Sequence, residues 1–192
     1  IEGAAGMGKS LLMQDLTAKA GEALPAARVL IGGGDAVERS TPYYGWRPVY
    51  ERLFAPDGPF DAAAREAFLA RLDPAARSLA PLLNSVLPLD LADNELTEAM
   101  AGEARRENTQ GLLIDMLRAA TAGAPLLLLF DDAQWLDSVS WSLALRARRE
   151  VEPLLLAMVT RPPGEDAPPD YLELVAQPAT RRIELGTLPP AV

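Results

Sequence analysis

The sequence predicts an α/β fold in which helices alternate with the strands of a parallel sheet. Short continuous apolar runs such as Leu126–Phe130 are typical of strands that are covered on both faces. Longer segments of helical periodicity separate these runs, which favours parallel over antiparallel pairing. A glycine-rich turn at Gly3–Ser10 leads directly into the first helical segment. The length of 192 residues suits one domain with a real core.

The first third of the chain is predicted to be helix, strand, helix. Residues Gly8–Ala23 have helical periodicity and end before Pro25. Ala27–Ile31 is a short apolar run that three consecutive glycines should end, and Tyr44–Phe54 follows as a helix. The apolar residues of the first helix are Leu11, Leu12, Leu16 and Ala20, and those of the second are Trp46, Val49, Tyr50 and Leu53.

The middle of the chain, about 56–122, reads as a helical segment inserted before the next strand. It is rich in Ala, Leu, Arg and Glu, and we expect helices broken near Pro74, Pro81 and Pro88. An apolar stripe near its end indicates core packing, and its members are Leu112, Leu113, Met116, Leu117 and Ala120.

The last third is predicted to return to the alternation of strands and helices. The helix at Ser138–Glu150 should have Ser138 or Ser140 near its cap. The remaining expected elements are a strand at Leu126–Phe130, a buried strand at Leu154–Val159, a short helix at Tyr171–Ala176 and a last strand at Arg182–Leu185. Pro162–Pro169 reads as a surface loop rather than a linker between domains.

Composition excludes several classes of function. The chain has 27 acidic and 18 basic residues, and the resulting net charge of −9 argues against direct nucleic-acid binding by this domain. The sequence contains neither cysteine nor histidine, which rules out disulfides, Cys/His zinc sites and histidine bases. No apolar run reaches membrane-spanning length, and we expect a cytoplasmic protein without a membrane partner.

The glycine-rich turn matches the phosphate-binding pattern G-x-x-x-x-G-K-[ST] in full. Gly6 and Gly8 let the backbone curl so that successive N–H groups face one centre, where they hold an anion together with the helix N-terminus. Lys9 supplies charge to the outer phosphates, and the Ser10 hydroxyl is a ligand for Mg²⁺. The residues expected to contact ATP are Gly3, Ala4, Ala5, Gly6, Met7, Gly8, Lys9, Ser10 and Leu11.

Two acids follow the strand predicted at Leu126–Phe130. Ligand sites lie beyond the carboxyl ends of parallel strands, where this fold needs a carboxylate. Asp131 is expected to hold Mg²⁺, through water, and Asp132 to orient or deprotonate the attacking water. An apolar run ending in two acids would look the same at a solvated junction, so the assignment depends on the phosphate loop.

The segment Asp131–Asp137 resembles the D-D/E-x-x-W-x-D motif of ATPase modules of the STAND class, relatives of the AAA+ ATPases. Such modules occur in large bacterial regulators, including cyclase-linked proteins and MalT-like or LuxR-type activators. Three other segments also look like this class: Thr41–Arg47, Thr160–Pro162 and Leu185–Pro189. The resemblance spans almost the whole chain, but the lid and winged-helix regions that usually follow are absent from it.

The resemblance implies a P-loop NTPase three-layer sandwich. It implies a parallel sheet of about five strands with the phosphate-loop strand in the middle, and a helical insertion before the Walker B strand. Thr160 or Arg161 would occupy the sensor position, with Arg161 contributing to catalysis, although Arg161 reads equally well as a solvated loop charge. Arg181 or Arg182 is either an arginine finger or an exposed pair. Trp46 and Trp135 are expected to pack rather than to stack on adenine.

These observations predict an ATP-binding switch module that hydrolyses ATP slowly with Mg²⁺, and hence a probable ATPase. Residues 1–192 would be a single ATPase core, a fragment of a longer signalling or transcriptional regulator whose first strand is cut to Ile1 and Glu2. Its partners would be nucleotide, the other domains of the parent chain and, depending on nucleotide, a second copy. One alternative is nucleotide binding for assembly without turnover. The other is a small-molecule kinase, for which Arg105–Arg106 would be a lid charge rather than a solvated pair on a helix.

Overall fold

The described strands form two parallel sheets, and one bridge connects the smaller sheet to the larger one. The computed structural model describes residues 1–164 and 167–186. The larger sheet has the order β2 (Arg28–Gly33), β3 (Leu126–Asp131), β4 (Leu154–Met158), and the smaller pairs β1 (Glu2–Gly3) with β5 (Glu184–Leu185). A parallel bridge between Glu2 and Thr160 places β1 beside the end of β4, so the strands run in the order β2-β3-β4-β1-β5.

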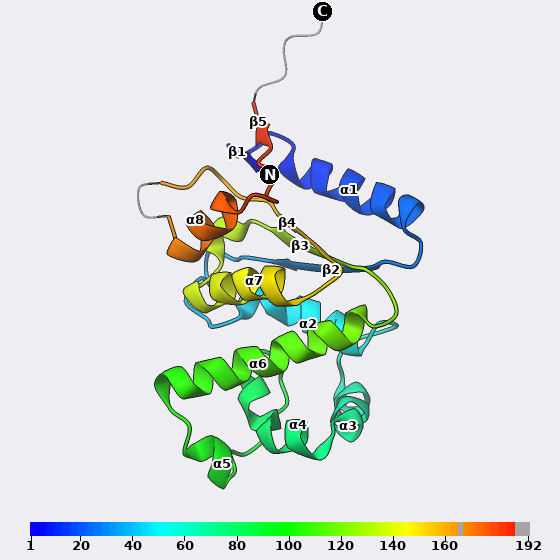
Figure 1. Ribbon diagram of the computed structural model, residues 1–192, viewed down its shortest axis with the longest axis vertical. Coiled ribbons are helices and arrows are strands. Elements are labelled where there is room, and N and C mark those ends of the chain that lie inside the picture. The colour runs from blue at the N-terminus through cyan, green and yellow to red at the C-terminus, as the bar shows by residue number, and fades with distance from the viewer. Residues whose placement is uncertain (165–166, 187–192) are drawn as a thin grey trace, which may run out of the picture.

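Helices cover the two faces of this sheet unequally. Helix α1 (Lys9–Ala23) lies on one face, whereas α2 (Arg47–Phe54) and α7 (Ser138–Glu150) lie on the other (Figure 1). Helix α6 (Gly102–Thr121) forms a further layer beyond α7 and α2. The sequence-based prediction of an α/β fold with parallel strands is confirmed, and the arrangement is consistent with a P-loop NTPase-like fold.

The face covered by α2 and α7 contains the main core. Leu128 and Phe130 of β3 are fully buried, and the ring of Trp46 lies 4.6 Å from that of Phe130. The face covered by α1 has a much smaller cluster, in which Met13 packs against Leu127 and Leu129 of β3, with Val159. On the β strands of that face Ile31 is 44% exposed and Leu155 is 55% exposed. The strand predicted to be buried at 154–159 is therefore only partly buried, with Leu155 exposed, Leu154 and Leu156 half-buried and Val159 fully buried.

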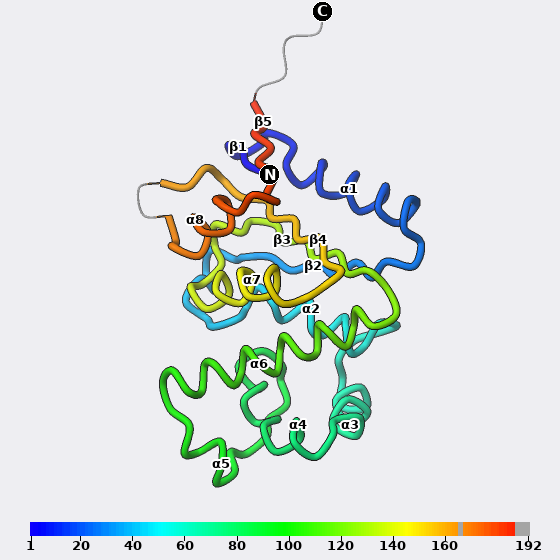
Figure 2. Tube along the Cα trace, viewed as in Figure 1, coloured from blue at the N-terminus to red at the C-terminus, as the bar shows by residue number. Residues whose placement is uncertain are grey.

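After α2 the chain forms a helical segment away from the sheet, and α6 leads back to β3 (Figure 2). The segment contains α3 (Ala62–Arg71), α4 (Pro74–Leu79), the 3-10 helix η2 (Ala80–Ser85), α5 (Glu95–Glu98) and α6. Pro74 and Pro81 begin helices here, where the sequence had suggested breaks, because proline fits the first helical turn, whose N–H groups have no partner inside the helix. The predicted stripe is in the core, except that Met116 is only partly buried.

Most predicted elements have nearly the predicted bounds, and the differences have local causes. Strand β2 continues through Gly32 and Gly33, which pair with Phe130 and Asp131, and glycine is required at position 32 because a Cβ there would lie 2.3 Å from the Gly45 carbonyl oxygen. The cap of α7 is the Asp137 side chain, which accepts from the Ser140 backbone N–H, rather than Ser138 or Ser140. The first turn of the second predicted helix is the 3-10 helix η1 (Tyr44–Trp46).

The phosphate-loop strand is not the middle strand of the five. Strand β1 lies between β4 and β5, so β4 is central in the combined order. The predicted last strand shortens to two residues, and α8 (Pro169–Ala176) precedes it. Thr187 to Pro189, part of the resemblance, lie outside the described residues. Within the described ranges, none of the helices has the length and apolar character that crossing a bilayer requires.

Candidate functional site

The glycine-rich loop joins β1 to α1 and presents free N–H groups at the start of the helix. Gly6 and Gly8 adopt the left-handed backbone conformation with φ of 78° and 82°, which favours glycine because it has no Cβ. Gly8 is the N-cap of α1, and no described side chain caps the helix or places an acid in its first turn. The helix N-terminus is therefore open to an anion, as the loop pattern predicts.

Lys9 and Ser10, the last two residues of the motif, each form a side-chain hydrogen bond. The Lys9 side chain folds back over the loop, where its Nζ donates to the Ala4 carbonyl oxygen at 2.8 Å. Ser10 Oγ donates to Asp131 Oδ2 at 2.8 Å, across 121 residues of sequence. The sequence-based pairing of the loop with the end of β3 is thus present in the structure as a direct hydrogen bond.

The Ser10 and Asp131 oxygens suit a hard divalent cation. Hydroxyl and carboxylate oxygens are the hard donors that Mg²⁺ prefers, and Ser10 Oγ and Asp131 Oδ2 lie 2.8 Å apart, so these two residues would hold the cation here. No group of three or more His, Cys, Asp or Glu able to hold a metal occurs among residues 1–164 and 167–186. A cation at this position would need phosphate oxygens and water to complete its coordination, as Mg²⁺ bound with a nucleotide has.

Asp132 lies in a tight turn directly after β3. Its backbone has a φ of 47°, and its N–H donates to Asp131 Oδ1 at 2.9 Å. Its Oδ1 accepts from Gln134 Nε2 at 2.7 Å, and Gln134 Oε1 accepts from the Arg161 backbone N–H at 3.0 Å. The structure thus brings Asp132 and Arg161 together through Gln134, a residue that sequence reasoning missed inside a motif that it had identified.

Thr160 and Arg161 follow β4, at the same sheet edge as the acids. Thr160 is buried, and its carbonyl oxygen accepts from the Gly3 N–H at 3.3 Å, which ties it to the start of the phosphate loop. Its hydroxyl donates to the Arg161 carbonyl oxygen at 3.0 Å. The Arg161 guanidinium lies 5.9 Å from the centre of the Trp135 ring, and the side chain is exposed.

The two tryptophans that were expected to pack rather than to stack on adenine, Trp46 and Trp135, differ in burial. Trp46 is fully buried, and its indole N–H donates to the Ser140 carbonyl oxygen at 3.1 Å. Trp135 is half-buried beneath Arg161. The Asp137 carboxylate of the same motif accepts from the Tyr43 backbone N–H at 3.1 Å, so part of the family-like sequence pattern connects structural elements rather than contacting ligand.

Glu2 is a second residue that the sequence did not single out. Its side chain is 5% exposed in β1, directly before the loop, and accepts from Tyr171 Oη at 2.6 Å and from Arg182 Nη2 at 2.7 Å. Burial, and then the hydrogen bond to Glu2, raises the pKa of Tyr171 to about 12. Arg182 also lies 3.2 Å from Glu184. Of the two arginines considered as fingers, Arg182 is therefore engaged within its own chain.

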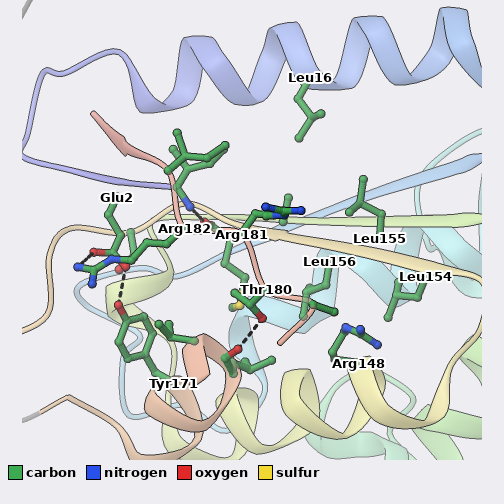
Figure 3. Close-up of a pocket in the computed structure, with 18 of the residues that line it drawn as sticks. Glu2, Leu16, Arg148, Leu154, Leu155, Leu156, Tyr171, Thr180, Arg181 and Arg182 are labelled. Atoms are coloured by element: carbon green, nitrogen blue, oxygen red, sulfur yellow. Dashed lines mark hydrogen bonds and ion pairs between the residues drawn. The ribbon is translucent and has the colours of Figure 1, made fainter. Parts of the chain in front are cut away.

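A cavity of about 720 Å³ opens beside β4, on the other side of Glu2 from the loop. Figure 3 shows its wall of leucines, with Leu16 from α1 above and Arg148 and Arg181 at its edge. Its long side follows Leu154–Met158, where the edge of β4 that faces away from β3 pairs with no described strand until the bridge at Thr160. The cavity is thus a gap between β4 and residues 179–183, which lead into β5. The phosphate-binding groups of the loop do not line it.

Comparison with known proteins identifies a family. The model of the AAA ATPase domain family matches residues 1–157, which include the loop, the strand that ends in Asp131 and most of β4. The match ends before Thr160 and Arg161. No curated protein and no solved structure matches the chain.

Proposed function

The chain belongs to the AAA ATPase domain family, and we propose that Gly3–Leu11 binds the phosphates of ATP with Mg²⁺ at Ser10 and Asp131. The observation that carries this proposal is the hydrogen bond of 2.8 Å between Ser10 and Asp131. It joins the two halves of a phosphate and cation site that lie far apart in sequence. Lys9 is near enough to turn from the Ala4 carbonyl oxygen to an outer phosphate.

The proposed reaction is the hydrolysis of ATP to ADP and phosphate. The oxygen of water attacks the γ-phosphorus, and the bond to the bridging oxygen of ADP breaks. Asp132 would orient this water and accept its proton, while Lys9 would stabilise the charge on the phosphoryl oxygens. Mg²⁺ bound at Ser10 would neutralise charge on the β- and γ-phosphates. Thr160 or Arg161, at the adjacent strand end, would respond to the γ-phosphate.

We propose that hydrolysis is slow and resets a switch in a multidomain signalling or transcriptional regulator. Support comes from the resemblance to STAND-class modules, and from the placement of the site on two strands of different sheets. A ligand that binds both Ser10 and Asp131 binds more tightly when the loop and β3 are close together than when they are apart. It therefore favours the arrangement in which they are close. ATP and ADP would then favour different arrangements of this core.

Loss of ATP binding in Lys9→Ala tests the proposal. We expect the Kd for Mg-ATP to rise about 100-fold or more, since each lost hydrogen bond to a charged group contributes about 1.5–3 kcal/mol. Calorimetric titration measures it, and Lys19→Ala is the matched control, because Lys19 is exposed on the same helix and, among the described residues, pairs with Asp15 alone. Equal affinity for the native chain and Lys9→Ala would overturn the assignment of the loop.

The second candidate is nucleotide binding without turnover. The aspartate at position 132 reaches less far than a glutamate would, which favours this candidate because the placement of water depends on geometry. Phosphate release under single-turnover conditions decides between the candidates. Release that disappears in Lys9→Ala supports hydrolysis, whereas binding with no Lys9-dependent release supports the second candidate.

The kinase alternative loses its sequence support, because Arg105 pairs with Asp93 and Arg106 with Glu103 and Glu107.

A further inference from the structure

The amide of Gln134 connects the acid turn after β3 to the loop after β4. Its Oε1 accepts from the Arg161 backbone N–H at 3.0 Å, and its Nε2 donates to Asp132 Oδ1 at 2.7 Å. A backbone N–H can only donate, so the amide oxygen must face Arg161 and the NH₂ group must face Asp132. The orientation of the amide is therefore determined, and it offers Asp132 a donor.

The turn that carries Gln134 is attached to β4 at a second point. The 3-10 helix η3 (Ala133–Trp135) begins at Ala133, whose N–H donates to the Val159 carbonyl oxygen at 2.8 Å. Ala133 is fully buried. The backbone of this turn is thus fixed against the end of β4, while the Asp132 side chain is exposed and could occupy several rotamers. Among the described residues, Gln134 is the side chain that hydrogen-bonds to the Asp132 carboxylate.

The end of β4 is in turn attached to the start of the phosphate loop. The Thr160 carbonyl oxygen accepts from the Gly3 N–H, and Glu2 and Thr160 form a parallel bridge. A displacement of the loop on binding ATP would therefore move the Thr160–Arg161 segment. The amide of Gln134 would pass that displacement to the Asp132 carboxylate.

We propose that Gln134 is a positioning residue, which directs the Asp132 carboxylate toward the attacking water and couples it to the Thr160–Arg161 segment. This role rests on the proposed function, because it requires Asp132 to act in hydrolysis. It assigns to Gln134 an effect on turnover and not on nucleotide affinity. The amide contacts the acid and the loop after β4, and none of its described hydrogen bonds reaches Gly3–Ser10.

Two substitutions of Gln134 test the contributions of its two amide hydrogen bonds. Gln134→Leu removes both hydrogen bonds with little change in volume. Gln134→Glu keeps an acceptor for the Arg161 N–H but places a second carboxylate against Asp132. We expect kcat to fall about 10- to 100-fold in both variants, because misplacement of a general base lowers the rate by this amount. The Kd for Mg-ATP should stay unchanged. Gln14→Glu is the control for added charge, because Gln14 is exposed on α1, outside the proposed site.

A pH profile and a double variant distinguish positioning from a merely structural role. In Gln134→Glu, uptake of a proton by the introduced carboxyl restores a donor toward Asp132, so its kcat relative to the native chain should rise as the pH falls. In an Asp132→Asn background, Gln134→Leu should cause no further loss of kcat. Unchanged or increased kcat in Gln134→Leu, or additive losses in the double variant, would overturn the proposal. Native protein that binds Mg-ATP without turnover would instead overturn the proposed hydrolysis on which the proposal rests.

Discussion

The two parts of the sheet differ in how strongly they are built, although the candidate site uses both. Strands β2 and β3 are joined by six residue pairs, and β3 and β4 are joined by five. Helices α2 and α7 cover one face of these strands, and the main core lies beneath them. Strands β1 and β5 share two pairs, and β1 meets β4 at a single bridge. The phosphate loop extends from the weaker part, and the two acids extend from the stronger part.

This difference indicates how a ligand would act on the domain. A phosphate and a cation bound to both Ser10 and Asp131 would connect the weaker part to the stronger one. Binding to the folded arrangement stabilises it by mass action, and segments with few packed neighbours open most easily without a ligand. The proposed switch would therefore lie in β1, β5 and α1 rather than in the main core.

The largest effect on stability is expected from the stronger part. Leu128 is fully buried in the main core, so Leu128→Ala should lower the free energy of unfolding by about 2–5 kcal/mol, through lost burial and the cavity left behind. Urea denaturation followed by circular dichroism measures the change, and a shift of the midpoint without a change of slope would identify it as a change in stability.

The control for this substitution is Leu155→Ala in the neighbouring strand. Leu155 is 55% exposed on the face that carries α1, so we expect a loss below about 1 kcal/mol. Equal losses for the two leucines would mean that the face beside α1 is packed as well as the main core, which would contradict the comparison.

A smaller and more local effect is expected from Glu2→Gln in the weaker part. The substitution removes the charge that pairs with Arg182, although the amide oxygen can still accept from Tyr171. We expect a loss of about 1–2 kcal/mol, which is the range for a hydrogen bond to a charged group in a partly exposed setting. Hydrogen exchange should show faster exchange of the Glu2 N–H, which donates to the Ile183 carbonyl oxygen, with β3 unchanged.

Glu184→Gln provides the matched comparison for that experiment. Glu184 also lies near Arg182, but its side chain is 70% exposed, and exposed ion pairs contribute little to stability. Exchange in β1 should therefore be close to native in this variant. If Glu2→Gln instead accelerated exchange throughout β3, the two parts of the sheet would open as one unit.

The parts of the candidate site that could be predicted from the sequence lie in contiguous motifs. Gly6, Gly8, Lys9 and Ser10 belong to one short pattern whose residue types the chemistry requires. Asp131 followed from the rule that ligands bind beyond the carboxyl ends of parallel strands, and its contact with Ser10 agrees with that rule. The strand and helix order was predictable for the same reason, because apolar runs and helical periodicity are local signals.

The contacts that tune the site were beyond sequence reasoning, because they join residues that are distant in the chain. Gln134 meets Arg161 across 27 residues, and Glu2 meets Tyr171 across 169 residues. Neither spacing is a motif, and a glutamine between two motif positions reads as an ordinary polar residue. Leu11 lies on the predicted apolar face of the first helix but is 70% exposed, since the buried residues of α1 include Met13 instead. Which side of a helix meets a sheet depends on the angle of the turn before it.

The smallest expected effect concerns pH, and it tests the contact between Tyr171 and Glu2. The pKa of Tyr171 is raised to about 12, above its ordinary value of 10.0, first by burial and then by the hydrogen bond to Glu2. A raised pKa in the folded state contributes stability that is fully present below pH 10.0 and is lost as the pH rises through about 12. The attachment of α8 to β1 should therefore weaken over this interval.

Ultraviolet difference absorbance between the native chain and Tyr171→Phe isolates this titration from those of the other tyrosines. We expect a midpoint near pH 12 in the native chain, and a lower one in Glu2→Gln, because the neutral amide no longer disfavours a negatively charged tyrosine. A midpoint at the ordinary value in the native chain would show that Tyr171 is solvated. In that case Glu2 would have only Arg182 as a partner, and the weaker part of the sheet would be held by its two strand pairs and the bridge at Thr160.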